Sequence, residues 1–192
     1  MHETTCGTTN KLPITVAFLL PEECFQLIAL YRRKLAGSCL RFDELETAHL
    51  TVKYLGYCSP SFSERHVAHL IPRIAELTKS FVPMNIAIRG IDLFETHPDS
   101  SPVVFLKVLS CGQLSAMHEA LRLGLSKEIE PFPHADGENY IPHITLSKNI
   151  DLRRQETVKK LIFRSKKTAK RHFTLSELVL LTPTAIHPIT RT

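Results

Sequence analysis

Two periodicities of hydrophobic and polar positions divide this 192-residue chain into predicted strands and helices. Short β-branched apolar runs that end at Pro or Gly are typical of strands, and apolar residues spaced by three or four are typical of helices. We expect strands over residues 13–20, 49–54, 85–94, 103–109 and 173–181, with a further short strand over 185–190. We expect helices over residues 21–36, 63–80, 115–129 and 151–163.

The order of these elements indicates an α+β fold with largely antiparallel sheet. Strands 85–94 and 103–109 are expected to form a hairpin through a turn at residues 97–102. Residues 131–142 hold three prolines and a glycine and are expected to form a loop. In both halves of the chain, a strand with the same polar pattern follows a helix, which suggests a loose internal duplication.

Composition is that of a globular protein, with 43% hydrophobic and 22% charged residues. No apolar run approaches the length of a membrane span, and the first dozen residues lack the apolar stretch of a signal peptide. The five cysteines are dispersed without Cys-x-x-Cys spacing, so neither a disulfide framework nor a zinc site is indicated. We expect a cytoplasmic monomer without a membrane partner, with residues 1–11 flexible.

Charge favours an anionic partner, because the net charge is +5 and the sequence pI is about 9.0. The basic excess lies late in the chain. Such a run is most often a solvated helix and loop, and the alternative is a track for RNA. The residues concerned are Arg153, Arg154, Lys159, Lys160, Arg164, Lys166, Lys167, Lys170 and Arg171.

One four-residue pattern occurs in opposite halves of the chain, as His49-Leu50-Thr51-Val52 and as His143-Ile144-Thr145-Leu146. Successive side chains of a strand point to opposite faces, so each copy places its His and Thr on one face and its aliphatic pair on the other. If the two strands face one cleft, they supply two imidazoles and two hydroxyls. Acid–base chemistry at a phosphodiester needs these groups.

The spacing His-x-Thr occurs four times, where composition alone predicts about one occurrence. His2 lies in a polar terminus without the aliphatic positions. His172-Phe173-Thr174-Leu175 does fit the pattern, but it directly follows the basic run. We interpret this third copy as the start of a structural strand.

The flanks of the two tetrads resemble a known family. Residues 48–56 (AHLTVKYLG) and 142–148 (PHITLSK) are similar to the two motif segments of bacterial and archaeal RNA 2′,3′-cyclic phosphodiesterases, also called 2′-5′ RNA ligases. These belong to the 2H phosphoesterase superfamily. The resemblance implies one bilobal domain over residues 1–192, two largely antiparallel sheets with pseudo-twofold symmetry around a central cleft, helices outside, and no required metal or cofactor.

The resemblance also implies roles for the motif residues, with His49 as the proton donor and His143 as the base. The hydroxyls of Thr51 and Thr145 can bond the non-bridging phosphoryl oxygens. Since the two copies are nearly symmetric, the residues alone leave the acid and base assignments interchangeable.

Further substrate contacts are expected beside the tetrads. Strand alternation carries Lys53 and Ser147 onto the tetrad faces and turns Tyr54 and Lys148 away, unless a bulge redirects them. Lys148 is a phosphate contact by analogy with the family, where Arg stands in place of Lys53 and Lys148; Lys keeps the charge and loses the bidentate fork. The aromatic candidates for base stacking are Tyr57, Phe132 and Tyr140, with Phe94 assigned rather to the core.

The expected activity is metal-independent hydrolysis of a 2′,3′-cyclic phosphodiester at an RNA 3′ end or on a small nucleotide. The alternatives are hydrolysis of 2′-5′ oligoadenylate, of a cyclic dinucleotide or of ADP-ribose cyclic phosphate, and a nucleotide-binding module without turnover. His66 and His69 lack a completing ligand cluster for a metal. The remaining histidines are expected on the surface: His97, His118, His134 and His187.

Overall fold

The computed structural model describes residues 13–42, 44–45, 47–57, 64–94, 102–109 and 111–189. The terminal segment expected to be flexible and most of the turn expected at 97–102, including His97, lie outside these ranges.

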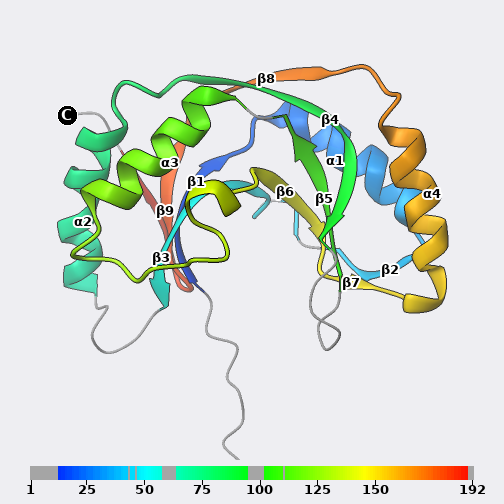
Figure 1. Ribbon diagram of the computed structural model, residues 1–192, viewed down its shortest axis with the longest axis horizontal. Helices are drawn as coiled ribbons and strands as arrows, with labels where there is room; N and C mark the ends of the chain where they lie inside the picture. The colour runs from blue at the N-terminus through cyan, green and yellow to red at the C-terminus, as the bar shows by residue number, and fades with distance from the viewer. Residues whose placement is uncertain are drawn as a thin grey trace, which may run out of the picture.

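Two four-stranded antiparallel sheets form the framework (Figure 1). The first sheet has the order β10-β9-β1-β3 and the second the order β6-β5-β4-β8. A small third sheet pairs β2 with β7. The α+β class with two antiparallel sheets is thereby confirmed. The strand bounds are β1 Pro13–Leu19, β2 Cys39–Arg41, β3 His49–Tyr57, β4 Met84–Phe94, β5 Val103–Val108, β6 His143–Ser147, β7 Asn149–Ile150, β8 Arg171–Leu175, β9 Leu178–Leu181 and β10 Ile186–Pro188.

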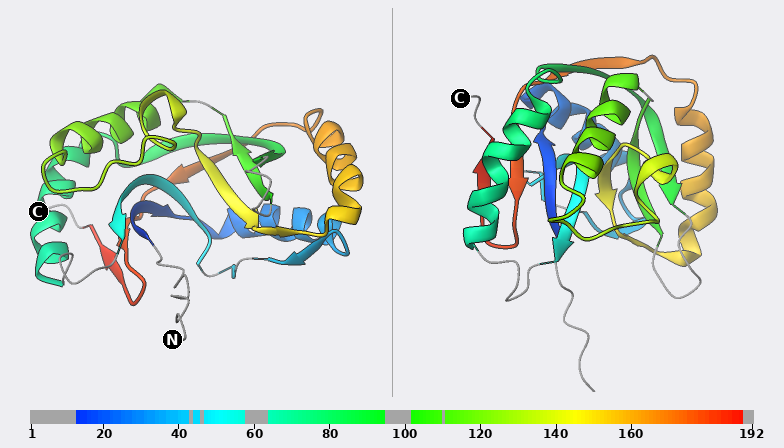
Figure 2. Two further views of the ribbon diagram at one scale, coloured as in Figure 1. Left: turned by 60° about the horizontal axis from the view of Figure 1, so that its bottom comes forward. Right: turned by 60° about the vertical axis from the view of Figure 1, so that its left-hand side comes forward.

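All four expected helices are present, as α1 Glu22–Leu35, α2 Glu64–Thr78, α3 Gly112–Gly124 and α4 Gln155–Ser165. Single turns of 3₁₀-helix occur at Gly137–Asn139 and Leu152–Arg154. Helix α3 begins before its expected start because the Cys111 side chain accepts a bond from the Leu114 amide and caps the first turn. Helices α2 and α3 lie at one end of the molecule, and α1 and α4 at the other (Figures 1 and 2).

The strand expected over residues 173–181 is wrong as a single element. It is two strands in different sheets, because β8 pairs with β4 whereas β9 pairs with β1. The break falls at Ser176 and Glu177, which are both exposed. At this point the chain crosses from the second sheet to the first. The short strands β2 and β7 were also not expected from the sequence pattern.

The expected duplication is visible in the order of the elements. A strand, a helix and then the motif strand occur in the order β1, α1, β3, with the short β2 between α1 and β3, and again in the order β5, α3, β6, with a 3₁₀ turn between α3 and β6; both strand pairs are antiparallel. Each sheet also takes strands from the other half of the chain, since β4 joins the second sheet and β9 joins the first. The motif strands β3 and β6 are each at the edge of their sheet, and these two edges contact each other (Figures 1 and 2).

Helix α4 packs closely on β4 at Gly90, where β4 also departs from regular pairing with β5. Gly90 has a φ of +68°, and a Cβ there would lie 2.5 Å from the Ser165 hydroxyl oxygen and 2.7 Å from its carbonyl oxygen. The Ser165 hydroxyl meanwhile accepts a hydrogen bond from the Ile91 amide. Only a residue without a side chain fits between the helix and the strand.

We therefore predict that Gly90→Ala lowers the free energy of unfolding by about 2 kcal/mol or more, through backbone strain and the clash with Ser165. Urea unfolding followed by circular dichroism measures the change. Gly112→Ala is the control, because a Cβ at Gly112 meets no atom within 4 Å. Equal stability of the two variants would contradict the close packing described here.

Candidate active site

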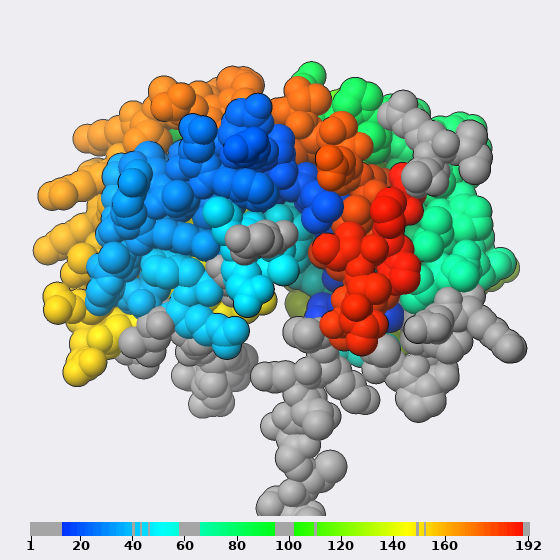
Figure 3. Space-filling model, turned by 180° about the vertical axis from the view of Figure 1, so that it is seen from behind, coloured from blue at the N-terminus to red at the C-terminus, as the bar shows by residue number. Residues whose placement is uncertain are grey.

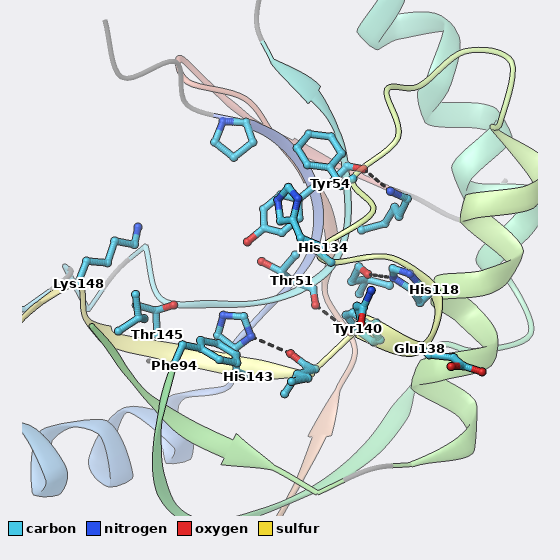
Figure 4. A pocket seen from close by; sticks show the side chains of 18 of the residues that line it. Thr51, Tyr54, Phe94, His118, His134, Glu138, Tyr140, His143, Thr145 and Lys148 are labelled. Carbon is cyan, nitrogen blue, oxygen red and sulfur yellow. Dashed lines mark hydrogen bonds between the residues drawn. The ribbon is translucent and has the colours of Figure 1, made fainter. Parts of the chain in front are cut away.

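The contact between the edges of β3 and β6 brings both tetrads to one cleft. His49, Thr51, His143 and Thr145 line the same hollow of about 510 Å³. A second hollow of about 780 Å³ opens from the same place and shares Thr51, His143 and Thr145 with the first. In Figure 4, His143 and Thr145 project from β6 toward Thr51 on β3. Residues ninety-four positions apart in the sequence thus lie around one site.

A β-bulge lies at Val52, the last residue of the first tetrad. In the register between β1 and β3, Ala17 is opposite Thr51 and Val16 is opposite Lys53, so Val52 has no partner of its own. An extra residue in one strand shifts the alternation of its side chains by one position. Lys53 is consequently paired on the face of Leu50, and Tyr54 returns to the face of His49 and Thr51.

A second bulge lies at the equivalent position, Leu146, which is the last residue of the second tetrad. Phe105 is opposite Thr145 and Val104 is opposite Ser147, so Leu146 is the unpaired residue. Ser147 turns away from the cleft, is fully buried, and donates its hydroxyl hydrogen to the Arg41 carbonyl. Lys148, the next residue, is exposed and lines both hollows.

The paired bulges place four residues differently from simple alternation. Lys53 and Ser147 are buried, whereas Tyr54 and Lys148 line both hollows; Lys53 also borders the larger hollow. The reason is one additional residue in each strand, which the alternation of apolar positions does not reveal. Sequence reasoning therefore missed Tyr54 as a site residue, and its only available signal was its place next to the tetrad.

The two imidazoles have matching hydrogen bonds. His49 Nδ1 lies 2.8 Å from the Thr47 carbonyl oxygen, and His143 Nδ1 lies 2.8 Å from the Ile141 carbonyl oxygen. A carbonyl can only accept, so each Nδ1 carries the hydrogen. In a neutral ring this leaves the basic lone pair on Nε2. The backbone two residues before each histidine thereby selects its tautomer.

His143 occupies an apolar surround that favours its neutral form. The edge of its ring contacts Phe94, with ring centroids 4.8 Å apart, and also contacts Phe105, at 5.3 Å. Burial lowers the pKa of His143, and the positive charges of His49 and Lys148 lower it further, against the raising effect of the Ile141 carbonyl. Phe94, which was assigned to the core, lines the cleft instead.

The larger hollow has an aromatic wall beside the motif residues. Tyr57 is 39% exposed at its rim, whereas Phe132 is buried and contacts the rings of Tyr54 and Tyr57 at 5.5 and 5.6 Å between centroids. His134 also lines this hollow and is exposed, as expected (Figure 4). The wall offers apolar surface next to polar motif groups, which suits a nucleoside.

A buried polar network fastens the loop after residue 130 to the β3 bulge. Asp136 accepts a bond from Lys53 Nζ at 2.6 Å and one from the Phe132 amide at 2.9 Å. Lys53 also donates to the Tyr54 carbonyl at 2.8 Å. The Lys53 side chain, which was expected to contact phosphate, is fully buried in this ion pair, and the residue also lines the larger hollow.

His118 belongs to this network, and the expectation that it lies on the surface is wrong. It is 2% exposed, and its Nδ1 donates to the carbonyl of the bulge residue Val52 at 2.7 Å. Burial lowers the pKa of His118, in keeping with a neutral ring whose Nε2 accepts from the Gly137 amide. Tyr140 stacks on His118 and donates its hydroxyl hydrogen to the Thr51 carbonyl at 2.9 Å. One face of the Tyr140 ring is therefore covered.

The third copy of the pattern does not join the site. His172 and Thr174 are exposed on β8, at the edge of the second sheet opposite β6, and neither lines the cleft. His187 is half-buried on β10. In the part of the chain that the structure describes, no three His, Cys, Asp or Glu side chains are grouped to hold a metal ion.

The family model of the 2′-5′ RNA ligase superfamily matches residues 21–185. The chain belongs to this superfamily. Membership supports phosphoester hydrolysis or ligation in general. No curated protein matches the sequence significantly.

Solved structures share the fold over nearly the whole chain. TT0787 of Thermus thermophilus is 20% identical with a TM-score of 0.59, and covers 93% of this chain and 96% of its own. Apo LigT of E. coli is 16% identical with a TM-score of 0.56, covering 95% and 96%. Usb1 of Kluyveromyces marxianus is 10% identical with a TM-score of 0.54, covering 92% and 98%. Over the described ranges, no helix has the length and apolar character to cross a membrane.

We predict that Asp136→Asn lowers the free energy of unfolding by about 3 kcal/mol, because it leaves the buried Lys53 ammonium without a counter-charge. The double variant Lys53→Met/Asp136→Asn should recover part of this loss. Glu76→Gln is the control, since its ion pair with Lys79 is exposed and is expected to contribute below about 1 kcal/mol. Urea unfolding measures these variants and Lys53→Met alone, and a loss in the double variant equal to the sum of the two single losses would refute the coupling.

Proposed function

We propose that this protein is a phosphodiesterase that opens a 2′,3′-cyclic phosphate, at the 3′ end of an RNA or on a small nucleotide. The observation that carries the proposal is the pair of His-x-Thr strands lining one cleft, each imidazole with its Nδ1 hydrogen held by a backbone carbonyl. The fold relative LigT has been solved with 3′-AMP and with phosphate, and Usb1 with uridine monophosphate, which supports a nucleotide ligand.

The lowered pKa of His143 supports its assignment as the base. A neutral His143 accepts a proton at Nε2 from the attacking water, whose oxygen bonds to phosphorus. One P–O bond to the ribose breaks, and the leaving oxygen takes a proton from Nε2 of protonated His49. The product is a ribose monophosphate, and the next turnover begins once His143 has lost its proton and His49 has regained one.

The charge that develops on the phosphoryl oxygens needs donors fixed in advance. Thr51 and Thr145 supply hydroxyls from the two sides of the cleft, and Lys148 supplies a positive charge at its open side. We propose that the base binds against Tyr57 and Phe132. Tyr54 lies between this aromatic wall and the tetrad. Tyr140 and Lys53 are proposed to act indirectly, through the position of the β3 backbone.

A second substrate class is favoured by the two hollows. They meet at the motif residues, so a phosphorus atom bound there has room for a substituent on either side. A 2′-5′-linked diester, as in 2′-5′ oligoadenylate, has this form. A substrate panel that compares 2′,3′-cyclic AMP, RNA with a cyclic terminus and 2′-5′ oligoadenylate ranks these candidates by kcat/KM.

We predict that His49→Ala and His143→Ala each reduce hydrolysis of 2′,3′-cyclic AMP at least about 100-fold, because each removes a positioned acid or base. Monophosphate formation is followed by chromatography, with and without EDTA, and turnover should persist in EDTA. His172→Ala is the matched control, as it removes the same residue type from the same pattern outside the cleft. Absence of product from the unaltered protein in both conditions would refute the proposal that it hydrolyses a cyclic mononucleotide.

We predict a pH dependence that identifies His143 as the base. Its neutral form is the active one, so kcat/KM falls as the pH drops through its pKa, which lies below the ordinary value of about 6.5. Lys148→Ala removes a neighbouring positive charge and raises this pKa, so the acidic limb moves to higher pH.

The control for this pH profile is Lys79→Ala, because Lys79 lies just beyond the end of α2, outside the cleft. Its acidic limb should coincide with that of the unaltered protein. An unchanged acidic limb in Lys148→Ala would show that His143 is not the group titrating there.

A further inference from the structure

Helix α4 presents a basic face with an aromatic centre that the proposed chemistry does not use. Residues 155–167 contain five cations and one carboxylate, Glu156. The helix buries Val158, Ile162 and Ser165 against the protein, so its other side is open. We call this open side the basic face of α4, and its members are exposed: Lys159, Lys160, Phe163, Arg164, Lys166 and Lys167.

Phe163 has no packing role that accounts for its position. Its residue surface is 65% exposed, the highest value among the exposed large hydrophobic residues of the described chain. Residues three and four apart lie next to each other on a helix, so Lys159 and Lys160 border Phe163 on the preceding turn of α4. Lys166 and Lys167 directly follow the end of α4 at Ser165. Lys167 Nζ lies 5.4 Å from the centre of the Phe163 ring.

A hollow of about 410 Å³ runs along this face between α4 and the end of β4. It is lined by Lys159, Phe163 and Lys166 on the helix side and by Asp92 and Leu93 on the strand side. The residue after Leu93 on β4 is Phe94, which lines the proposed active site. Leu93 and Phe94 are consecutive residues, so the hollow beside α4 and the cleft both reach the same end of β4.

An aromatic ring within a group of cations matches the alternation of bases and phosphates in a single nucleic-acid strand. Proteins that bind such strands combine base stacking on aromatic side chains with phosphate contacts from Lys and Arg. A membrane-surface helix would instead expose a continuous apolar face, and the apolar face of α4 is already buried against the protein. In the view from behind, the side chains of α4 (yellow to orange) protrude along one edge of the molecule (Figure 3).

We propose that the basic face of α4 binds single-stranded RNA, with a base stacked on Phe163 and phosphates on the flanking lysines. The proposal rests on the proposed function, because it assigns the substrate as an RNA strand whose 3′ end enters the cleft and whose preceding nucleotides reach α4. A free cyclic mononucleotide uses only the cleft.

The test measures binding and turnover separately. A short 5′-fluorescein single-stranded RNA with a terminal 2′,3′-cyclic phosphate is titrated at several salt concentrations and followed by anisotropy, with the His49→Ala protein to prevent cleavage. In that background Phe163→Ala is expected to weaken binding about tenfold. Lys160→Ala/Lys167→Ala is expected to weaken binding and to reduce the slope of log affinity against log salt by about 1.4, for two lost phosphate contacts.

The matched control is Lys79→Ala/Lys127→Ala, which removes the same charge from exposed positions beyond the ends of α2 and α3. It should keep the unaltered slope. With His49 intact, the α4 variants should hydrolyse 2′,3′-cyclic AMP at the unaltered rate. Absence of this hydrolysis in the unaltered protein would count against the proposed function. Unchanged RNA binding in the α4 variants would count against the role of α4. Equal RNA affinity of the α4 and control variants would overturn it, as would α4-dependent binding to anionic phosphatidylserine vesicles without binding to RNA.

Discussion

The site depends on one constraint, which is that two sheets meet through the edges formed by β3 and β6. An edge strand exposes unpaired backbone groups, and proteins manage such edges with bulges or covering segments. Both devices occur here. The bulges at Val52 and Leu146 interrupt the two strands at the last residue of each tetrad. The loop after residue 130 covers β3, because the Glu130 amide donates to the Leu55 carbonyl and the Tyr140 hydroxyl donates to the Thr51 carbonyl.

The two halves of the site share their backbone and differ in what surrounds it. Each histidine donates a hydrogen bond from Nδ1 to the backbone carbonyl two residues earlier, and a bulge residue follows each threonine. The second half adds Phe94 and Phe105 around His143, whereas the first half has the buried network of Lys53, Asp136 and His118 behind its strand. The surroundings of the second half therefore lower the pKa of His143.

Periodicity sufficed for most of the fold, because the helices and the main strands bury continuous apolar stripes that can be read locally. The convergence of the two tetrads could be proposed from their matching polar faces and from the family resemblance, because alternation by itself leaves each polar face free to meet solvent separately. The break at Ser176 and Glu177 could not, because residues on either side are equally strand-like and only their partners, β4 and β1, separate them.

The bulges and the buried network could not be inferred for a related reason. A bulge is defined by the register between two strands, and the sequence of one strand does not specify which residues of the partner strand lie opposite. The sequence around His118 likewise gives no sign that its ring is buried. The burial depends on hydrogen bonds with Val52 and Gly137, which belong to distant segments of the chain. The side-chain positions of Lys53, Tyr54, Ser147 and Lys148 all follow from such non-local pairing.

The exchange of strands between the halves has a consequence for motion. Strand β4 belongs to the sheet of the later half and β9 to that of the earlier half, while α3 from the later half packs on α2 and β3. Hinge-bending enzymes close two lobes that are joined by a few linker residues, and here the chain crosses repeatedly between interlocked layers that share one hydrophobic core. Separating the lobes would mean unpacking that core, so the cavity between β3 and β6 is formed by folding itself and not by the closure of two lobes.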